Sequence, residues 1–321
     1  MNVYTDISAY DGKPSVATVG LFDGVHLGHQ SLLRQLTAEA HNRGLLSLVV
    51  TLHPHPRVVL SKGNDRVGLL TTLSERTSLI SSLGVDRLLV LPFTRQFSDL
   101  SARQFIANYL RDQLSVRLLL LGYNHRFGSD NLNPDDYIRI ATDEGLIAER
   151  QQQFTLPHVT KISSSEVRRA LSEGNIELAN TLLGRPYLVC GKVVHGDALG
   201  RTLNAPTANL NVNPDKQLPA DGVYAALART DDSQTHLAIV NIGTRPTLAS
   251  SDRRLEAHII DYDNQIYGQE LSLLFLSKIR NEQKFDNTNQ LKEQIQKDEQ
   301  QIRAKLSLQN LTNLFAWFDF H

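Results

Sequence analysis

The chain has 321 residues, which at about 100 to 200 residues per domain predicts two domains. Its 33 lysine and arginine residues nearly balance 34 aspartate and glutamate residues, which argues against nucleic acid or an anionic membrane as a partner. The single cysteine, Cys190, excludes an internal disulfide framework, and with an N-terminus that lacks a signal-peptide pattern it favours a cytoplasmic protein.

The first part of the chain alternates short apolar runs with amphipathic stretches. Five runs read as strands: SVATVGLF (15–22), LLSLVVTL (45–52), RLLVLPF (87–93), VRLLLLG (116–122) and GLIAERQQQF (145–154). Runs that are apolar on both faces, with helices between them, indicate a parallel sheet covered on both sides. We therefore expect a doubly wound α/β domain.

Helix-end patterns agree with this alternation. One face of the first predicted helix is apolar, through Leu32, Leu33, Leu36 and Ala40, and Gly44 follows where a left-handed residue ends a helix. Two pairs fit capping boxes: Thr72 with Glu75, and Ser101 with Gln104. Four further glycines are predicted to end helices: Gly84, Gly145, Gly174 and Gly184.

The rhythm changes after residue 184. Six closely spaced strand-like runs follow: YLVCGKVVHG (187–196), PTANLNV (206–212), GVYAALART (222–230), HLAIVNIG (236–243), RLEAHIIDY (254–262) and LSLLFLSKI (271–279). Strands without intervening helices predict an antiparallel barrel or sandwich, and the charged stretch 289–306 predicts a closing surface helix. The expected domains are residues 1–184 and 185–321.

A glycine-rich turn after the first predicted strand carries two histidines, His26 and His29. Its glycines let the backbone approach a ligand closely at the strand end where open α/β sheets bind ligands: Gly20, Gly24 and Gly28. A helix that begins near His29 would favour a phosphate, and the imidazoles would add donors for the charge that develops in adenylyl transfer. The alternative is a surface turn that happens to carry two histidines.

The stretch KISSSEVRRAL (161–171) places hydroxyl groups and Arg168 at a second helix start, which favours another anion-binding element. A charged first turn on a solvated helix is the alternative.

These segments resemble the nucleotidyltransferase superfamily, whose H-x-G-H signature is matched by HLGH and whose second signature is matched by ISSSEVR. Four motifs, VGLFDGVHLGHQ, TLHPHP, GYNHRFG and ISSSEVRRAL, stand in the order found in the FMN adenylylating module of bacterial bifunctional riboflavin kinase/FAD synthetases. The resemblance implies a Rossmann-like fold in which His26 and His29 hold ATP phosphates and Ser164 and Arg168 complete the clamp. The ATP-binding residues that it implies are Gly20, Phe22, Gly24, Gly28, Asn124 and Ser164.

A second candidate site lies in GKVVHGDALGRTLNAPTANL (191–210), which has no Walker pattern. A glycine-rich arch could cup phosphates with its backbone amides, through Gly191, Gly196, Gly200 and Arg201. On a strand, Thr207 and Asn209 share one face, and their oxygen atoms suit Mg²⁺. Glu256, facing inward on a barrel strand beside His258, could accept a proton from an alcohol that attacks the γ-phosphate. A surface or salt-bridged glutamate is the alternative.

The second half resembles the riboflavin kinase module through GRTLNAPTANL, DGVYAA, VNIGTRPT, LEAHIID and YGQELSLLFLSKIRNEQKF. This resemblance implies a six-stranded antiparallel barrel with a terminal helix, Mg²⁺ on Thr207 and Asn209, and activation of the ribityl 5′-hydroxyl by Glu256. It implies that the segment IRNEQKF, with Arg280 and Glu282, helps to enclose the isoalloxazine ring.

Together the motifs predict an enzyme that phosphorylates riboflavin to FMN and adenylylates FMN to FAD, with ATP and Mg²⁺ in both steps. A kinase alone is a competing hypothesis, because His125 replaces a phenylalanine usual in GYNHRFG and the stretch after Gly128 lacks an expected arginine. In the kinase module, Asn204 and Ala205 replace a Gly-Phe pair, which could loosen the flavin or adenine pocket. A non-catalytic flavin-binding regulator is a hypothesis from a different class. A nucleotidyltransferase that acts on a pantetheine or glycerol phosphate would leave the second half of the chain unexplained.

Overall fold

The computed structural model of the chain describes residues 1–60, 68–123, 126–130, 132–195, 206–230, 234–244 and 253–305. The chain divides into two compact units, Met1–Ser163 and Ser164–His321. Helices α7 (Ser164–Ser172) and α8 (Ile176–Leu183) therefore group with the second unit, although they precede the boundary expected at residue 184.

The first unit contains a six-stranded parallel sheet with the order β1-β4-β3-β2-β5-β6. Its strands are β1 (Asn2–Tyr4), β2 (Ser15–Val19), β3 (Leu46–His53), β4 (Arg87–Pro92), β5 (Val116–Leu121) and β6 (Ile147–Arg150). The five predicted strands are confirmed, whereas the sequence patterns do not predict the short edge strand β1. The order reverses direction at β2, which makes this a doubly wound sheet, and open α/β sheets generally bind ligands at the carboxyl ends of the strands where the order reverses.

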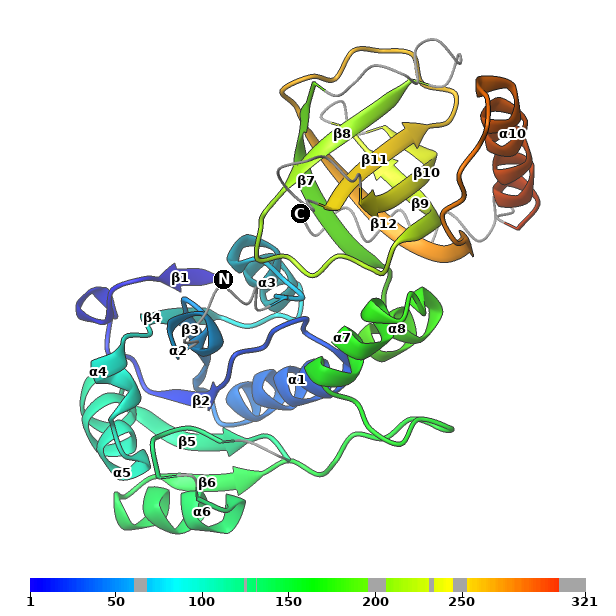
Figure 1. Cartoon of the computed structure of the whole chain (residues 1–321). Coiled ribbons are helices and arrows are strands. Elements are labelled where there is room, and N and C mark those ends of the chain that lie inside the picture. The colour runs from blue at the N-terminus through cyan, green and yellow to red at the C-terminus, as the bar shows by residue number, and fades with distance from the viewer. Residues whose placement is uncertain are drawn as a thin grey trace. The chain divides into compact units, whose positions relative to one another are not determined.

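Helices cover both faces of this sheet (Figure 1). They are η1 (Ile7–Ala9), α1 (Leu27–Asn42), α2 (Pro56–Leu60), α3 (Leu73–Ser81), α4 (Arg95–Ser98), α5 (Ala102–Phe105), which continues as the π-helical segment η2 (Ile106–Gln113), and α6 (Pro134–Asp143). Both predicted capping boxes are present, and the glycines predicted to end helices have left-handed backbones.

Two separate cores explain why the strands are apolar along their whole length. In β2, Val16 packs with α1 and α3, whereas Ala17 and Val19 pack on the other side with α5, η2 and α6. Because neighbouring side chains of a strand point to opposite faces, a sheet that is covered twice needs apolar residues at both alternating positions.

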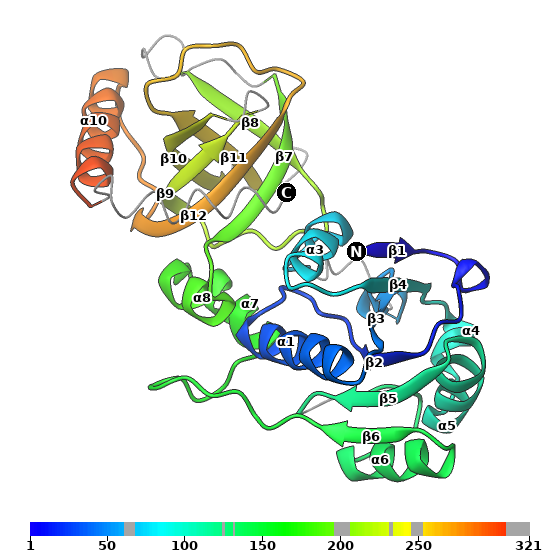
Figure 2. The ribbon, with the colours of Figure 1, turned by 180° about the vertical axis from the view of Figure 1, so that it is seen from behind.

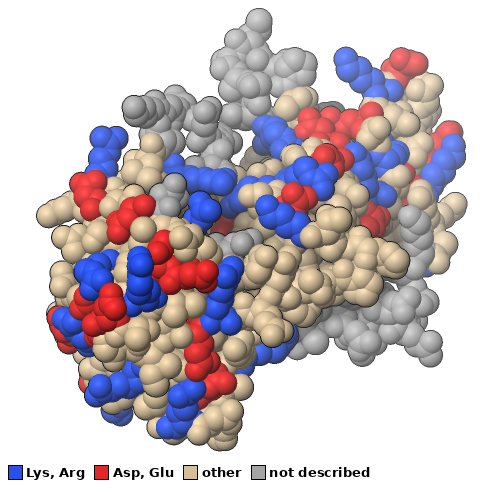
Figure 3. Space-filling view, turned by 90° about the horizontal axis from the view of Figure 1, so that it is seen from below, with Lys and Arg blue, Asp and Glu red and all other residues tan. Residues whose placement is uncertain are grey.

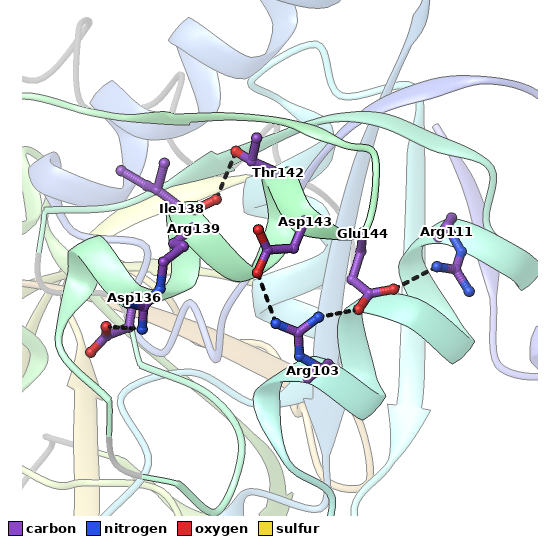
Figure 4. A network of polar contacts seen from close by, with 8 residues as sticks. All are labelled: Arg103, Arg111, Asp136, Ile138, Arg139, Thr142, Asp143 and Glu144. Carbon is purple, nitrogen blue, oxygen red and sulfur yellow. Dashed lines mark hydrogen bonds and ion pairs between the residues drawn. The ribbon is translucent and has the colours of Figure 1, made fainter.

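An exposed ion-pair network joins α6 to α5 and η2 (Figure 4). Arg103 contacts Asp143 at 2.9 Å and Glu144 at 2.5 Å, and Arg111 contacts the other oxygen of Glu144 at 2.6 Å. Since Glu144 is only 15% exposed and accepts from two arginines, it is the best-placed member of the network. The network fixes the helices on one face of the sheet relative to each other.

The second unit contains a closed antiparallel barrel with the order β10-β11-β8-β7-β12-β9 (Figure 2). Its strands are β7 (Tyr187–Val194), β8 (Thr207–Val212), β9 (Gly222–Arg229), β10 (Thr235–Thr244), β11 (Arg253–Ile259) and β12 (Glu270–Arg280). All six predicted strands are confirmed, and closure between β10 and β9 decides for a barrel over a sandwich. The predicted closing helix is α10 (Thr288–Lys305).

Two helical elements are fastened to this barrel. Helix α10 packs Ile295 and Ile302 against it and buries Asp298, which is ion-paired with Arg280 of β12 at 2.9 Å. The α7–α8 pair is held by Asn180, whose Nδ2 donates to the Phe275 carbonyl at 2.9 Å and whose Oδ1 accepts from the Tyr187 amide at 2.8 Å. The start of the second unit is thus ordered by barrel contacts.

The charges on the surface match the balanced composition. On the face drawn in Figure 3, Lys and Arg side chains alternate with Asp and Glu side chains. Within the described ranges, every helix is too short or too polar to cross a membrane.

Candidate functional site

The loop that joins β2 to α1, residues 20–26, leaves the carboxyl end of the central strand β2. Three of its residues have left-handed backbones: Phe22 at φ 50°, Gly24 at 84° and Val25 at 39°. Only glycine adopts this region without steric cost, and each non-glycine residue held there costs on the order of 1–3 kcal/mol. The β2–α1 loop is therefore a strained segment that surrounding contacts must stabilise.

His26 and His29 come together at the start of α1. Their rings stack with centroids 3.6 Å apart and 18° between planes, and Phe22 meets His29 edge-on at 5.2 Å. Helix α1 begins at Leu27, two residues before the predicted start, because His26 is its N-cap and its Nδ1 accepts from the His29 amide at 3.3 Å. The neutral His26 ring therefore carries its proton on Nε2.

Gly28 explains this close stacking. A Cβ at position 28 would lie 3.3 Å from the His26 ring, tighter than most side-chain contacts, so glycine lets the imidazole lie against the first turn of α1. Gly20 has a similar role, since a Cβ there would meet the Phe22 ring at 2.9 Å. These two glycines of the predicted ATP site therefore shape the loop through close approach.

The β2–α1 loop is tied to the segment that precedes α3. The Asp23 carboxylate accepts from the Leu70 amide at 3.2 Å and from the Thr71 amide at 3.0 Å. The Thr71 hydroxyl donates to Asp23 at 3.2 Å and accepts from the Gly24 amide at 3.0 Å. Asp23 and Thr71 are buried, so this bridge replaces water with fixed partners.

Another histidine, His53 of the motif TLHPHP, ends strand β3, beside β2 in the sheet. Desolvation and the positive charge of Arg76 lower the pKa of His53, which favours its neutral ring. The motif thus lies at the carboxyl end of the strand next to β2.

The second predicted anion element lies on α7, in the second unit. Ser164 is its first residue and Arg168 follows one turn later, so both occupy one face of the helix. Both side chains are half-buried. Asn124, which the resemblance assigns to the same site, lies outside the described residues, as does the departure at His125.

Polar residues of β8 and β11 form one face of the barrel wall. Asn209 lies opposite Glu256 and Thr207 lies opposite His258 in the β8–β11 register. We call Thr207, Asn209, Glu256 and His258 the polar face. Directly opposed residues have Cβ atoms about 4.5–5.5 Å apart, so the predicted metal-binding oxygens and the predicted base are neighbours.

The expectation that Glu256 faces inward is wrong. Leu255, Ala257 and Ile259 are at most 5% exposed and fill the interior, whereas Glu256 and His258 alternate with them and are half-buried. A carboxylate on the outer side of the wall can meet a substrate and water, which an interior position would not allow.

Asn241 extends the polar face to a third strand, and no sequence pattern marks it. It lies opposite Glu256 in the β10–β11 register, and its Nδ2 donates to Glu282 Oε1 at 3.3 Å. Glu282 can lie there because residue 243 is glycine, and a Cβ at Gly243 would overlap its carboxylate. The motif VNIGTRPT carries both Asn241 and Gly243, but only the register relates them to Glu256.

Arg280, expected beside the flavin, is bound elsewhere. Its Nε and Nη2 donate to Asp298 at 3.0 and 2.9 Å, and Nη1 donates to the Asn281 carbonyl at 3.1 Å. Asp298 is 2% exposed on its side chain, so the pair anchors α10 and the start of the segment that carries Glu282.

Gly191 does not belong to a glycine-rich arch. It lies inside β7, paired with Leu271 and Val212, and a Cβ there would meet the Asn211 carbonyl oxygen at 2.8 Å. Close strand packing therefore requires this glycine. Several other predictions for this segment lie outside the described residues: Gly196, Gly200, Arg201, Asn204 and Ala205.

A pocket of about 180 Å³ adjoins the polar face. Thr207 and Asn209 line it, and apolar and aromatic walls come from Ile259, Tyr262, Ile266 and Tyr267. The Tyr267 ring also stacks on His195 at 3.9 Å. Flat aromatic walls beside oxygen ligands suit a ligand with a planar ring and a phosphate group.

Two family models match consecutive parts of the chain. The FAD synthetase model matches residues 9–166, and the riboflavin kinase model matches residues 183–306. The first match contains the β2–α1 loop, and the second contains the polar face and its pocket. The chain therefore has both a FAD synthetase domain and a riboflavin kinase domain.

Curated relatives match over nearly their whole length. A bifunctional riboflavin kinase/FMN adenylyltransferase from Listeria monocytogenes is 39% identical over 94% of this chain and 93% of its own, and one from Escherichia coli is 38% identical over 91% and 93%. A crystal structure from Streptococcus pneumoniae, described as a macrolide-efflux protein, superposes with a TM-score of 0.84 at 31% identity, covering 94% of this chain and 98% of that one. The chain belongs to the family of bifunctional riboflavin kinase/FMN adenylyltransferases.

Proposed function

We propose that the β2–α1 loop with its stacked His26 and His29 is the FMN adenylylation site, and that the polar face of the barrel is the riboflavin phosphorylation site. The stacked histidines at the N-terminus of α1 carry the first assignment, because two aligned imidazoles at a helix N-terminus have no structural task that one capping residue would not fulfil.

In adenylylation, a phosphate oxygen of FMN attacks the α-phosphorus of ATP, a new P–O bond forms, and the bond to the β-phosphate breaks to release pyrophosphate. His26, His29 and the first amides of α1 stabilise the negative charge that builds on the phosphate oxygens. Ser164 and Arg168 of α7, with Asn124, complete the grip on the nucleotide. We assign residues 1–184 to the adenylylating domain, because this range includes Ser164 and Arg168 and the riboflavin kinase match begins only at residue 183; the FAD synthetase match itself ends inside α7 at residue 166.

In phosphorylation, Glu256 accepts the proton of the ribityl 5′-hydroxyl. The oxygen of that hydroxyl attacks the γ-phosphorus of ATP, and ADP leaves. The half-buried position of Glu256, opposite Asn209, supports this role, since the carboxylate is reachable and its neighbours are polar. The pocket beside Thr207 takes the adenosine of ATP, and Glu282 contacts the flavin.

The oxygen donors on the polar face fit Mg²⁺. The described residues contain no cluster of three or more His, Cys, Asp or Glu side chains able to hold a metal ion. Thr207 and Asn209 instead offer neutral oxygens on one face, and Mg²⁺ is commonly held by few protein ligands together with substrate phosphates and waters. When bound, the ion would neutralise charge on the transferring phosphates.

A chain with one cysteine also suits the reducing cytoplasm, where we place it.

Single variants separate the two reactions. His29→Ala should lower FAD formation from FMN about 100-fold, because one lost preorganised donor costs about 3 kcal/mol, while FMN formation continues. Thr207→Ala should suppress FMN formation and spare FAD formation from supplied FMN. Chromatography of products from riboflavin or FMN with ATP and Mg²⁺ measures both.

Matched controls use exposed residues of the same type. His41→Ala alters the last turn of α1, and Thr244→Ala alters the exposed end of β10; neither should change either rate by more than about twofold, as expected for surface substitutions. A folded His29→Ala protein that loses both products would refute the two-site assignment.

A further inference from the structure

The β2–α1 loop rests on a buried arginine that the adenylylation chemistry does not use. Arg76, in the first turn of α3, is 4% exposed. Its Nη1 donates to the Leu21 carbonyl at 2.5 Å, and the Thr51 hydroxyl reaches the same oxygen at 3.4 Å. Leu21 directly precedes Phe22, the first left-handed residue of the loop.

Burying a guanidinium lowers the stability of the folded chain, so a buried arginine is expected where its hydrogen bonds have a function. Desolvation lowers the pKa of Arg76, opposed by the nearby Asp23 carboxylate, but a guanidinium remains charged at neutral pH. Its Nε has no hydrogen-bond partner among the described residues. Leu79 and Ile80 share the apolar face of α3 with Arg76, so an apolar residue at position 76 would serve helix packing equally well.

The anchor acts at two points of the loop. After Phe22 in the chain, Asp23 and Gly24 are held by their hydrogen bonds with Thr71. Before Phe22, the Leu21 carbonyl is held by Arg76. The strained Phe22 therefore lies between fixed points. These contacts hold the backbone that leads into α1, at whose start His26 and His29 lie.

We propose that Arg76 is a positioning residue for FMN adenylylation, which fixes the β2–α1 loop through the Leu21 carbonyl so that both histidines meet the ATP phosphates in one arrangement. The inference rests on the proposed adenylylation site. Because the histidines act on charge that develops in the transition state, losing their alignment should lower kcat more than it raises KM for ATP.

The test uses full-length variants assayed with FMN, ATP and Mg²⁺. Arg76→Met should lower kcat for FAD formation about 10- to 100-fold, the range expected when catalytic groups move by about 1 Å, and should change KM for ATP less than about threefold. Arg76→Lys should recover part of kcat, because an ammonium group can donate to the same carbonyl. The riboflavin kinase rate of each variant gives the reference for active protein.

Arg87→Met is the matched control. Arg87, the first residue of β4, is equally buried in the same unit. It forms an ion pair with Asp11, which precedes β2 and lies outside the β2–α1 loop. Its variant should lose thermal stability without a selective loss of kcat. Thr71→Val removes the second anchor at nearly constant size and should lower kcat in the same direction, which keeps the test intact if Arg76→Met does not fold.

Three results would overturn the inference: wild-type kcat in Arg76→Met, no recovery in a folded Arg76→Lys, or a loss in Arg87→Met as large as in Arg76→Met. His29→Ala, measured alongside, tells which claim fails. If His29→Ala is inactive and Arg76→Met is active, only the positioning role is wrong; if His29→Ala is active, the proposed site itself is wrong.

Discussion

Gly243 of β10 has no side chain, and this leaves room for the carboxylate of Glu282. The absence of a Cβ lets the Glu282 carboxylate lie on the strand, within 3.3 Å of the Asn241 amide nitrogen. Asn241 in turn lies opposite Glu256. Two carboxylates that are far apart in the chain are thus placed on either side of one carboxamide.

Gly243→Ala should therefore raise KM for riboflavin about fivefold, the equivalent of one hydrogen bond worth about 1 kcal/mol, because the methyl group displaces Glu282 from the site proposed for the flavin. The displaced group is the end of a flexible side chain, so thermal stability should change little. Initial rates of FMN formation at varied riboflavin measure the effect.

The control is a double variant. In a Glu282→Ala background, Gly243→Ala should have no further effect on KM, because the group that it displaces is already gone. Additive effects would show that Gly243 acts on riboflavin binding independently of Glu282.

Tertiary contacts explain which residues the sequence could predict. His26 and His29 are three residues apart on a turn, so their pairing is local and can be predicted. Arg76 meets Leu21 across 55 residues. Because Arg76 shares an apolar helix face with Leu79 and Ile80, the sequence weakly indicates that its charge is buried. The sequence does not indicate that the Leu21 carbonyl is its hydrogen-bond partner.

Helix α10 depends on one buried ion pair for its place on the barrel. Its mostly polar sequence gives it a narrow apolar stripe, Ile295 and Ile302, and Asp298 lies on the same stripe. The Arg280 side chain is 16% exposed and reaches Asp298 with two nitrogens. Removing the charge of Asp298 would leave the Arg280 guanidinium largely buried and without a counter-charge, which lowers the free energy of unfolding.

Asp298→Asn should lower the free energy of unfolding of the barrel by about 3 kcal/mol, because it leaves the half-buried Arg280 guanidinium without its counter-charge. Urea unfolding followed by circular dichroism measures it. Glu299→Gln on the same helix removes only an exposed contact with Arg303 and should cost less than about 0.5 kcal/mol. Equal losses would contradict an anchoring role for Asp298.

Among the elements, those with local patterns are predictable and those without are not. Strands β2 to β12 carry apolar runs, and the capping boxes at Thr72 and Ser101 are written within four residues. Strand β1 has only three residues, Asn2–Tyr4, and is mostly exposed, so no periodicity marks it. The inward orientation expected of Glu256 is wrong because strand alternation gives two faces but does not tell which one is interior.

At the scale of the whole molecule, the residues proposed for the two reactions lie on, or directly follow, strands of different sheets. FMN is the product of phosphorylation and the substrate of adenylylation. Since the residues proposed for phosphorylation all lie on the barrel, and the stacked histidines follow a strand of the parallel sheet, loss of one site leaves the other chemically complete.

An equimolar mixture of full-length His29→Ala and Thr207→Ala should therefore convert riboflavin to FAD much faster than either variant does alone. FMN made by the first protein diffuses to the intact adenylylation site of the second. Product chromatography over time should show FMN rising before FAD. A mixture that stops at FMN, while the Thr207→Ala protein still converts added FMN, would mean that FMN must stay within one chain.

The α7–α8 pair has a consequence for any attempt to divide the protein. Its Asn180 bonds and the Ala220 amide, which donates to the Leu171 carbonyl at 2.8 Å, attach it to the barrel, yet it bears Ser164 and Arg168. Cleavage at residue 184 would separate α7 and α8 from the contacts that hold them. A fragment that ends between the two family matches would therefore carry Ser164 and Arg168 on an unsupported helix.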